Sequence, residues 1–265
     1  MAKELPRPTR GAGRHLRTLT SVTDDQPEVL AGANMGAVVR VGDTVLRQAG
    51  EWTPAVHRLL DHLEHHGVQG VPRVRGRTDD GREVLSFVPG LVPAYPMPTW
   101  VWSERALVSS ARLLRRIHDA TADADRGGPW RSAAHEPAEV VCHNDFATYN
   151  LVFDDEGEAV GVVDWDYASP GPRVWDLAYL AYRIVPMTTL DEGDGFTRAE
   201  RSVRLDTLLR GYRSDATPTQ IGTVLRRRLL ELADFSEAKA AELGKPELRD
   251  HALHYRQDAA ALPKA

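Results

Sequence analysis

The sequence predicts an α+β fold in which a small β-rich lobe precedes a larger, mainly helical one. Two observations predict it. Short β-branched runs alternate with turns through the first part of the chain, and helical periodicity dominates after a proline-rich connector at residues 84–103. We therefore expect a loose tail over residues 1–23, an N-terminal lobe over residues 24–90 and a C-terminal lobe over residues 91–265.

The small lobe is predicted to contain two hairpins and one helix. Residues 37–46 form β-branched runs around a Gly-Asp turn, which is typical of a hairpin. A helix is expected from Thr53, with Pro54 at its first position, as far as Gly67. Residues 72–87 then repeat the strand, turn and strand pattern.

Helices dominate the larger lobe. Ser103 is suited to cap the first of them, because serine side chains accept hydrogen bonds from the free amides of a helix start. Further helical patterns run near residues 173–184, 197–212 and 219–242. Residues 150–163 form a predicted hairpin between the first and second of these helices.

The composition is that of a globular protein without a nucleic-acid partner. The chain has 265 residues, a formal net charge of −5, and 42% hydrophobic and 27% charged residues. This length is sufficient for two lobes with a sizeable core. The acidic excess argues against nucleic-acid binding, since phosphate-binding surfaces are usually basic.

Cysteine use and hydropathy indicate a cytoplasmic protein. The single cysteine, Cys142, cannot form an internal disulfide, which suits a reducing compartment. No apolar run follows the basic N-terminal stretch, so a secretion signal is not expected. Residues 84–103 are uncharged, but their prolines would break a membrane helix, and we expect no membrane partner.

Five polar residues carry the strongest chemical signal. His143, Asn144 and Asp145 are followed by Asn150 and, at the far end of the hairpin, by Asp164. Taken singly, such residues most often cap helices or close turns. Together they offer two carboxylates and carboxamide oxygens, the ligands that Mg²⁺ prefers beside substrate phosphates. The combination suits phosphoryl transfer.

The motif resembles that of a known family. An H-x-D-x-x-x-x-N pattern, formed by His143, Asp145 and Asn150 and followed by Val-Val-Asp-Trp-Asp at residues 162–166, is similar to the aminoglycoside phosphotransferase and choline kinase family. That family shares the protein-kinase-like fold, so the resemblance, which spans about residues 28–185, implies a bilobal molecule with ATP and Mg²⁺ in its cleft.

The resemblance assigns roles in the larger lobe. Asp145 would be the catalytic base that accepts the proton of the substrate hydroxyl. The Mg²⁺ ligands would be Asn150 and Asp164. Supporting roles fall to three residues, which would order the catalytic loop or assist the metal ligands: His143, Asp166 and Asp176.

It also implies a nucleotide site in the small lobe. Gly32 and Asn34 lie in a turn that would cover the phosphates, and Ser86 and Val88 would hydrogen-bond adenine. Arg47 stands where the family has a phosphate-binding lysine. An arginine keeps the charge but has a planar fork of donors instead of an ammonium group.

No carboxylate partner for Arg47 is evident. The helix that should carry a glutamate reads Ala-Val-His-Arg at residues 55–58, and neither Glu51 nor Asp61 fits the alignment. Two further charged groups are expected to be solvated helix surface. They are the histidines at 62, 65 and 66, for which no cysteine or carboxylate set completes a metal geometry, and the arginines at 226–228.

The predicted function is an ATP- and Mg²⁺-dependent phosphotransferase. It would transfer the γ-phosphate to a hydroxyl of a small molecule, such as an aminoglycoside-like compound, a sugar or an amino-alcohol. Residues 186–265 contain 13 acidic and 13 basic residues, so they show no acidic excess for a polycationic substrate. Because of Arg47 and the absent helix carboxylate, the alternative is a catalytically silent nucleotide- or partner-binding protein.

Overall fold

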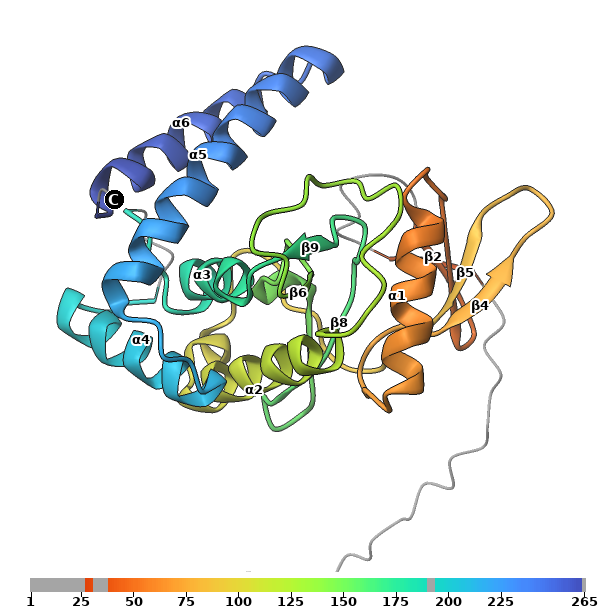
Figure 1. The fold of residues 1–265 in the computed structure, drawn as a ribbon, viewed down its shortest axis with the longest axis horizontal. Helices are drawn as coiled ribbons and strands as arrows, with labels where there is room; N and C mark the ends of the chain where they lie inside the picture. The colour runs from red at the N-terminus through yellow and green to blue at the C-terminus, as the bar shows by residue number, and fades with distance from the viewer. Residues whose placement is uncertain (1–26, 31–37, 190–193, 264–265) are drawn as a thin grey trace, which may run out of the picture.

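A computed structural model describes residues 27–30, 38–189 and 194–263. Its first part is a five-stranded antiparallel sheet in the order β1-β2-β3-β5-β4 (Figure 1). The strands are β1 (Glu28–Leu30), β2 (Val38–Val41), β3 (Thr44–Arg47), β4 (Val74–Arg77) and β5 (Glu83–Ser86). The two predicted hairpins, β2-β3 and β4-β5, are confirmed.

Helix α1 (Thr53–His65) lies between this sheet and the rest of the molecule (Figure 1). Pro54 occupies its first turn, where a missing N–H costs nothing. The stripe of Leu59, Leu60 and Leu63 is buried and belongs to the same hydrophobic core as the helices beyond. Burial of this stripe therefore joins the two lobes.

The larger lobe is built from five helices and two short strand pairs. Ser103 accepts a hydrogen bond from the Ala106 amide and caps the first helix, as predicted. The helices are α2 (Glu104–Ala120), α3 (Arg173–Ile184), α4 (Arg198–Tyr212), α5 (Pro218–Leu243) and α6 (Glu247–Ala261). The strand pairs are β6 (Val140–Cys142) with β9 (Ser169–Gly171), and β7 (Leu151–Phe153) with β8 (Ala159–Val162). Short 3₁₀ turns cover Thr99–Trp102 and Thr148–Asn150.

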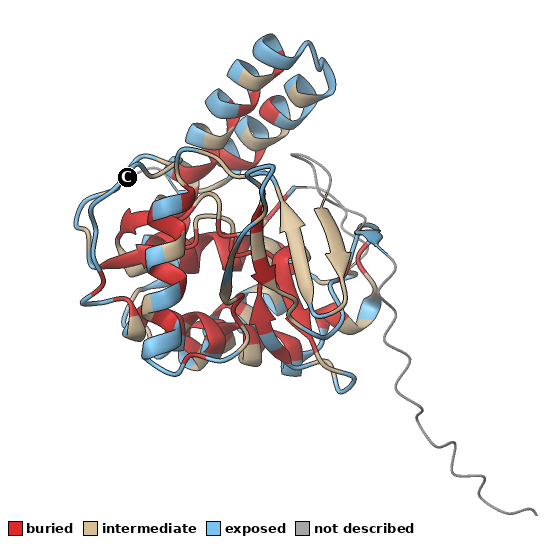
Figure 2. Cartoon of the chain, turned by 90° about the vertical axis from the view of Figure 1, so that its right-hand side faces the viewer, coloured by how far each residue is buried: buried red, intermediate tan, exposed pale blue. Residues whose placement is uncertain are grey.

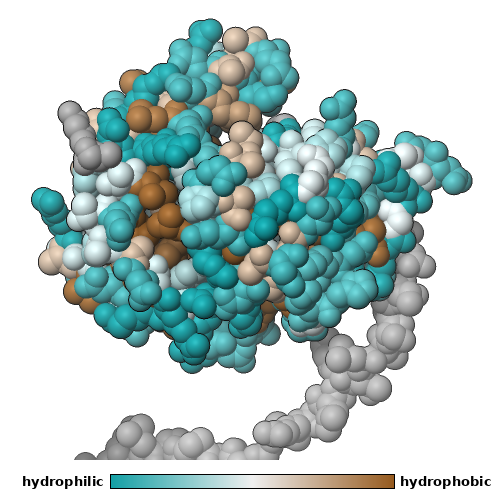
Figure 3. Space-filling model, viewed as in Figure 1, coloured by the Kyte–Doolittle hydropathy of each residue, from teal (hydrophilic) through white to brown (hydrophobic). Residues whose placement is uncertain are grey.

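Helices α5 and α6 form an antiparallel hairpin that projects from the body (Figures 1 and 2). Gly244 ends α5 in the left-handed conformation, with φ of 64°. The sequence did not predict α6, because its buried face consists only of Ala252, Asp258 and Ala259 and carries no apolar stripe. Apolar side chains gather beside α3, below this hairpin, on an otherwise hydrophilic face (Figure 3).

Backbone contacts connect the proline-rich connector and the small lobe to the β7-β8 hairpin. Leu91 and Phe153 exchange two backbone hydrogen bonds of 2.7 and 2.8 Å. The Gly70 carbonyl accepts from the Val162 amide at 2.8 Å, and a Cβ on Gly70 would lie 1.9 Å from the Val160 oxygen. Only glycine permits this approach, so the β7-β8 hairpin has a fixed position against the small lobe.

The predicted α+β, bilobal fold class is confirmed. The predicted tail lies outside the described residues, and the lobe boundary at residue 90 stays a prediction. Among residues 27–30, 38–189 and 194–263, no helix combines the length and apolarity needed to cross a membrane.

Candidate active site

The loop between β6 and β7 holds Asp145 by both of its carboxylate oxygens. Oδ1 accepts a hydrogen bond from the Tyr149 hydroxyl at 2.8 Å, and Oδ2 accepts from Asn150 Nδ2 at 2.8 Å. Asn150 also donates to the Asp145 carbonyl at 2.9 Å, and burial raises the pKa of Tyr149 well above its ordinary value. The carboxylate therefore has one orientation and two neutral donors.

Asp176, at the start of α3, fixes the beginning of this loop. Its carboxylate is fully buried and accepts from the backbone amides of His143 at 2.6 Å and Asn144 at 2.9 Å. Burial opposes its ionisation, but the hydrogen bond and charge of His118, 3.2 Å away, outweigh it, and the pKa of Asp176 is lowered. Asn144 can then hold a φ of 64°, which few residues other than glycine adopt.

His143 is a structural group in this arrangement. Its Nε2 lies 3.0 Å from the Val163 carbonyl and its Nδ1 accepts from the Asp145 amide at 3.2 Å, which is the pattern of a neutral ring protonated on Nε2. Burial lowers the pKa of His143, which favours the same neutral form. The ring links the Asp145 loop to the segment that precedes Asp164.

Arg228 also contacts the loop, which contradicts the prediction of a solvated arginine run. Its side chain is almost completely buried, donates to the Asn144 carbonyl and lies with its guanidinium carbon 4.2 Å from the centre of the Tyr179 ring. The prediction was wrong for this residue because the first half of α5 packs against α3.

Arg47 lies at the centre of a carboxylate cluster. Its Nε donates to Glu83 at 2.6 Å, Nη1 donates to Asp164 at 3.2 Å, and Nη2 donates to Asp166. The other oxygen of Glu83 lies 2.7 Å from His57 Nε2 on α1. The sequence indicated no carboxylate for Arg47 on the helix, where His57 lies, and it did not predict that Glu83 on a strand is the partner.

Strand register supplies this partner. Arg47 ends β3 and Glu83 begins β5, and the two residues face each other across the ladder. Glu83 is 1% exposed. Burial opposes its ionisation, but the hydrogen bond from His57 and the charge of Arg47 prevail, so the pKa of Glu83 is lowered. The available sequence signal was a charged residue at the end of one predicted strand and one of opposite charge at the start of another.

The two acids after β8 differ in their surroundings. Asp164 has a half-exposed side chain and a φ of 64°. Asp166 is nearly buried, bonds Arg47 and Arg131, and has its pKa raised chiefly by burial. The Val163 amide donates to the Asn150 carbonyl at 2.9 Å, so Asn150 and the segment carrying Asp164 run side by side.

The chemistry of this donor set fits Mg²⁺. The Asn150 carboxamide uses its nitrogen on Asp145, which leaves its oxygen as a ligand, and Asp164 offers an accessible carboxylate. Hard oxygen donors of this kind, completed by water and phosphate, are what Mg²⁺ takes in phosphoryl-transfer sites.

The remaining small-lobe predictions are untested. The Ser86 amide and hydroxyl both bond the Arg73 backbone, at 2.8 and 2.9 Å. Val88 lies in the connector, beside Gly161. Its backbone forms no hydrogen bond with the loops and turns among the described residues. Gly32 and Asn34 lie outside the described residues.

Sequence reasoning missed a cluster of tyrosines around Arg183. Tyr149 and Tyr179 approach through their hydroxyls at 3.1 Å, and Arg183 Nη2 donates to Tyr179 at 3.1 Å. The Arg183 guanidinium lies 4.8 to 5.5 Å from three ring centres, those of Tyr149, Tyr179 and Tyr182. The available signal was the pair Tyr179 and Tyr182, three residues apart on α3 and followed directly by Arg183.

Comparisons with known proteins show what the chain is similar to. The sequence model described as "Phosphotransferase enzyme family" matches residues 129–218. The trifolitoxin immunity protein of Rhizobium leguminosarum bv. trifolii is 38% identical over 149 residues. That match covers 53% of this chain and 55% of the relative, so the chain spans about half the length of the curated relative it matches.

Solved structures share the fold over nearly the whole chain. A choline/ethanolamine kinase family protein from Mesorhizobium loti is 19% identical, with a TM-score of 0.59 over 91% of this chain and 89% of that one. An amicoumacin kinase in complex with AMP-PNP, Ca²⁺ and Ami is 14% identical, with a TM-score of 0.64 over 90% of this chain and 89% of that one. The resemblance predicted from the sequence is thus confirmed: the chain has a kinase-like fold, and its residues 129–218 match the phosphotransferase enzyme family.

Proposed function

We propose that this protein is an ATP- and Mg²⁺-dependent phosphotransferase that acts on a hydroxyl of a small molecule. The observation that carries the proposal is the fixed carboxylate of Asp145, held by Tyr149 and Asn150 beside the segment that carries Asp164. A carboxylate with both oxygens oriented is suited to accept the proton of an attacking hydroxyl.

The other polar residues divide the remaining tasks. Asn150 and Asp164 would hold Mg²⁺, which neutralises charge on the phosphates when bound. Arg47 would bind the phosphates with Nη1, the donor that now contacts the exposed Asp164, while Glu83 and Asp166 keep its other nitrogens in place. When the nucleotide enters, Nη1 of Arg47 would move from Asp164 to a phosphate. The Asp164 carboxylate would then be free to bind the metal.

The acceptor would bind against the tyrosine cluster, because Tyr149 contacts Asp145 directly. The cluster carries both charges: Arg183 donates to Tyr179, whereas Tyr149 and Tyr182 donate to the carboxylates of Asp145 and Asp258. These charges do not favour an anionic over a cationic acceptor, so the cluster predicts only a hydroxylated molecule. The relative named for immunity to trifolitoxin and the amicoumacin kinase structure make a hydroxyl-bearing toxic compound our first choice of substrate.

A screen of ATP consumption against hydroxylated compounds tests this function, with Asp145→Asn as the critical variant. The asparagine can accept from Asn150 and donate to Tyr149, so the fold should persist. Turnover is expected to fall at least ~100-fold while nucleotide affinity is kept. Asp155→Asn, in the exposed turn of the β7-β8 hairpin, is the matched control and should retain full turnover. Equal activity of both variants would remove Asp145 from the mechanism.

One observation favours a second candidate, a silent nucleotide-binding protein. Arg47 engages Asp164 and Asp166 together and so competes with a metal ion for Asp164. ATP at about 100 times its Kd stabilises a fold by roughly 2.7 kcal/mol, which corresponds to about 5–10 °C in Tm. A kinase needs Mg²⁺ for the full shift and turns ATP over, whereas a silent protein gives the same shift without Mg²⁺ and consumes no ATP with any acceptor.

A further inference from the structure

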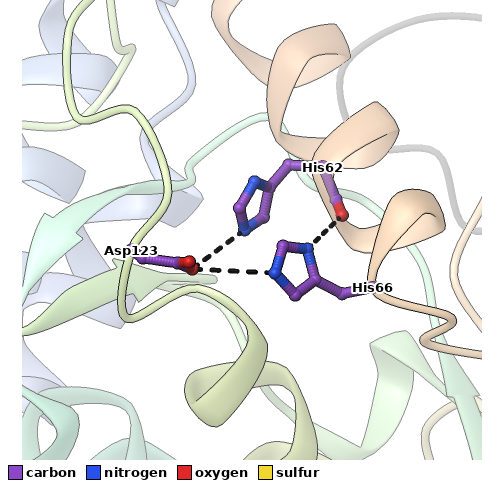
Figure 4. Close-up of side chains that lie close together, drawn as sticks. All are labelled: His62, His66 and Asp123. Atoms are coloured by element: carbon purple, nitrogen blue, oxygen red, sulfur yellow. Dashed lines mark hydrogen bonds and ion pairs between the residues drawn. The ribbon is translucent and has the colours of Figure 1, made fainter.

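His62 and His66 meet Asp123 on the surface, far along α1 from the carboxylate cluster. Figure 4 shows the two rings, from the end of α1, and the carboxylate, from the turn after α2, pointing toward one another. Asp123 Oδ1 lies 3.5 Å from His62 Nε2 and 3.8 Å from His66 Nε2. One ligand atom from each residue falls within 4.8 Å of the others. The sequence did not predict that a carboxylate lies beside two of these histidines.

We propose that His62, His66 and Asp123 form a binding site for a divalent transition metal of the Zn²⁺ class, which ties α1 to the turn after α2. Two imidazoles and a carboxylate are ligands that Zn²⁺ takes in proteins, with water in the fourth position. The inference is independent of the proposed catalytic function.

The tautomer of His66 is already suited to a metal. Its Nδ1 lies 3.0 Å from the backbone carbonyl of His62, to which it donates. The lone pair is then on Nε2, the nitrogen that faces Asp123. Metal-binding histidines are commonly fixed in this way by a hydrogen bond from their second nitrogen.

His62 would exchange a hydrogen bond for a bond to the metal. Its Nε2 lies 2.7 Å from the Ala120 carbonyl and donates there in the absence of metal. Metal binding replaces this proton, which moves to Nδ1 or to solvent, because the nitrogen that binds a metal must be deprotonated.

The surrounding contacts hold the ligands together without metal. Arg58, one turn before His62 on the same face of α1, donates to the Gly127 carbonyl at 2.7 Å and pairs with Asp125 at 3.3 Å. Residues 58, 62 and 66 therefore form one stripe, four residues apart, against residues 120–127. Helix α1 also carries His57, which contacts Glu83, the carboxylate partner of Arg47. A metal bound at the other end of α1 would therefore help to hold this helix in position.

Metal titration of the untagged protein tests the proposal. We expect one Zn²⁺ per chain by calorimetry, and with Co²⁺ the visible absorption of a four-coordinate site. His66→Asn and Asp123→Asn should each weaken Zn²⁺ binding at least ~10-fold. Loss of a residue that only hydrogen-bonds to a metal ligand already weakens binding by about that factor. At the same Zn²⁺ concentration the Tm of each variant should rise less than that of the parent.

His65→Asn is the matched control. This exposed histidine belongs to the same helix end but directs Nδ1 to the Asp61 carbonyl and lies outside the cluster. It should bind Zn²⁺ as the parent does. Absence of binding by the parent at 1:1 stoichiometry, binding that survives in the His62→Asn/His66→Asn double variant, or an equal loss in His65→Asn would overturn the proposal.

Discussion

Glu83→Gln is the most informative perturbation of the carboxylate cluster. Glu83 accepts two charge-assisted hydrogen bonds, from Arg47 at 2.6 Å and from His57 at 2.7 Å, at a position that is 1% exposed. A glutamine keeps the shape but not the charge. Charge-assisted bonds contribute about 1.5–3 kcal/mol and neutral ones about 0.5–1.5, so each bond loses about 1 kcal/mol and the variant loses about 2 kcal/mol of stability.

Urea unfolding and thermal melting measure this loss. For a chain of this size about 2 kcal/mol corresponds to a fall in Tm of about 4–8 °C. The control is Glu28→Gln on the same sheet, whose ion pair with Arg40 spans 4.0 Å and is largely exposed, so stability should change by less than ~0.5 kcal/mol. If Glu83→Gln is as stable as this control, Glu83 does not anchor Arg47.

The pH dependence gives an independent check. The pKa of Glu83 is lower in the folded than in the unfolded chain, so its contribution to stability is present above about pH 4.3, the unfolded value, and is lost as pH falls through the folded value. Glu83→Gln lacks this contribution at every pH. The stability difference between parent and variant should therefore shrink on acidification.

Two further variants test the catalytic loop. Tyr149→Phe should lower kcat about 10-fold, equivalent to about 1.4 kcal/mol, without changing nucleotide affinity, because Asp145 loses one orienting donor. Steady-state kinetics that match those of the parent would contradict this role. Asp176→Asn should lower the free energy of unfolding by at least ~2 kcal/mol, because it removes a buried charge partner of His118. The pKa of Asp176 is lowered in the folded chain, so below about pH 4 the parent should lose stability more steeply than the variant. Urea unfolding at a series of pH values measures both effects.

Local patterns in the sequence predicted most of the elements. The hairpins and α3 follow from periodicity and turn residues within a short stretch, and the residues of the catalytic loop follow from a motif of fixed spacing. Both signals are contained in neighbouring residues.

What the sequence did not predict depends on contacts between distant segments. Glu83 reaches Arg47 through the register of two strands that are not consecutive, and Asp123 reaches His62 across the boundary between α1 and the helical lobe. Arg228 becomes buried only because α5 packs on α3. Spacing along the chain carries no information on such pairings, which are set by packing.

The position of Glu83 within the sheet bears on how the nucleotide site can be controlled. An anchor on a neighbouring strand moves with Arg47, so a rotation or slide of α1 would break the contact with His57 and leave the pair of Arg47 and Glu83 intact. The cation is thus in place as soon as β3 and β5 have paired. Helix displacement cannot switch this site off, and control of the protein would have to act on Asp164 or on access of the acceptor.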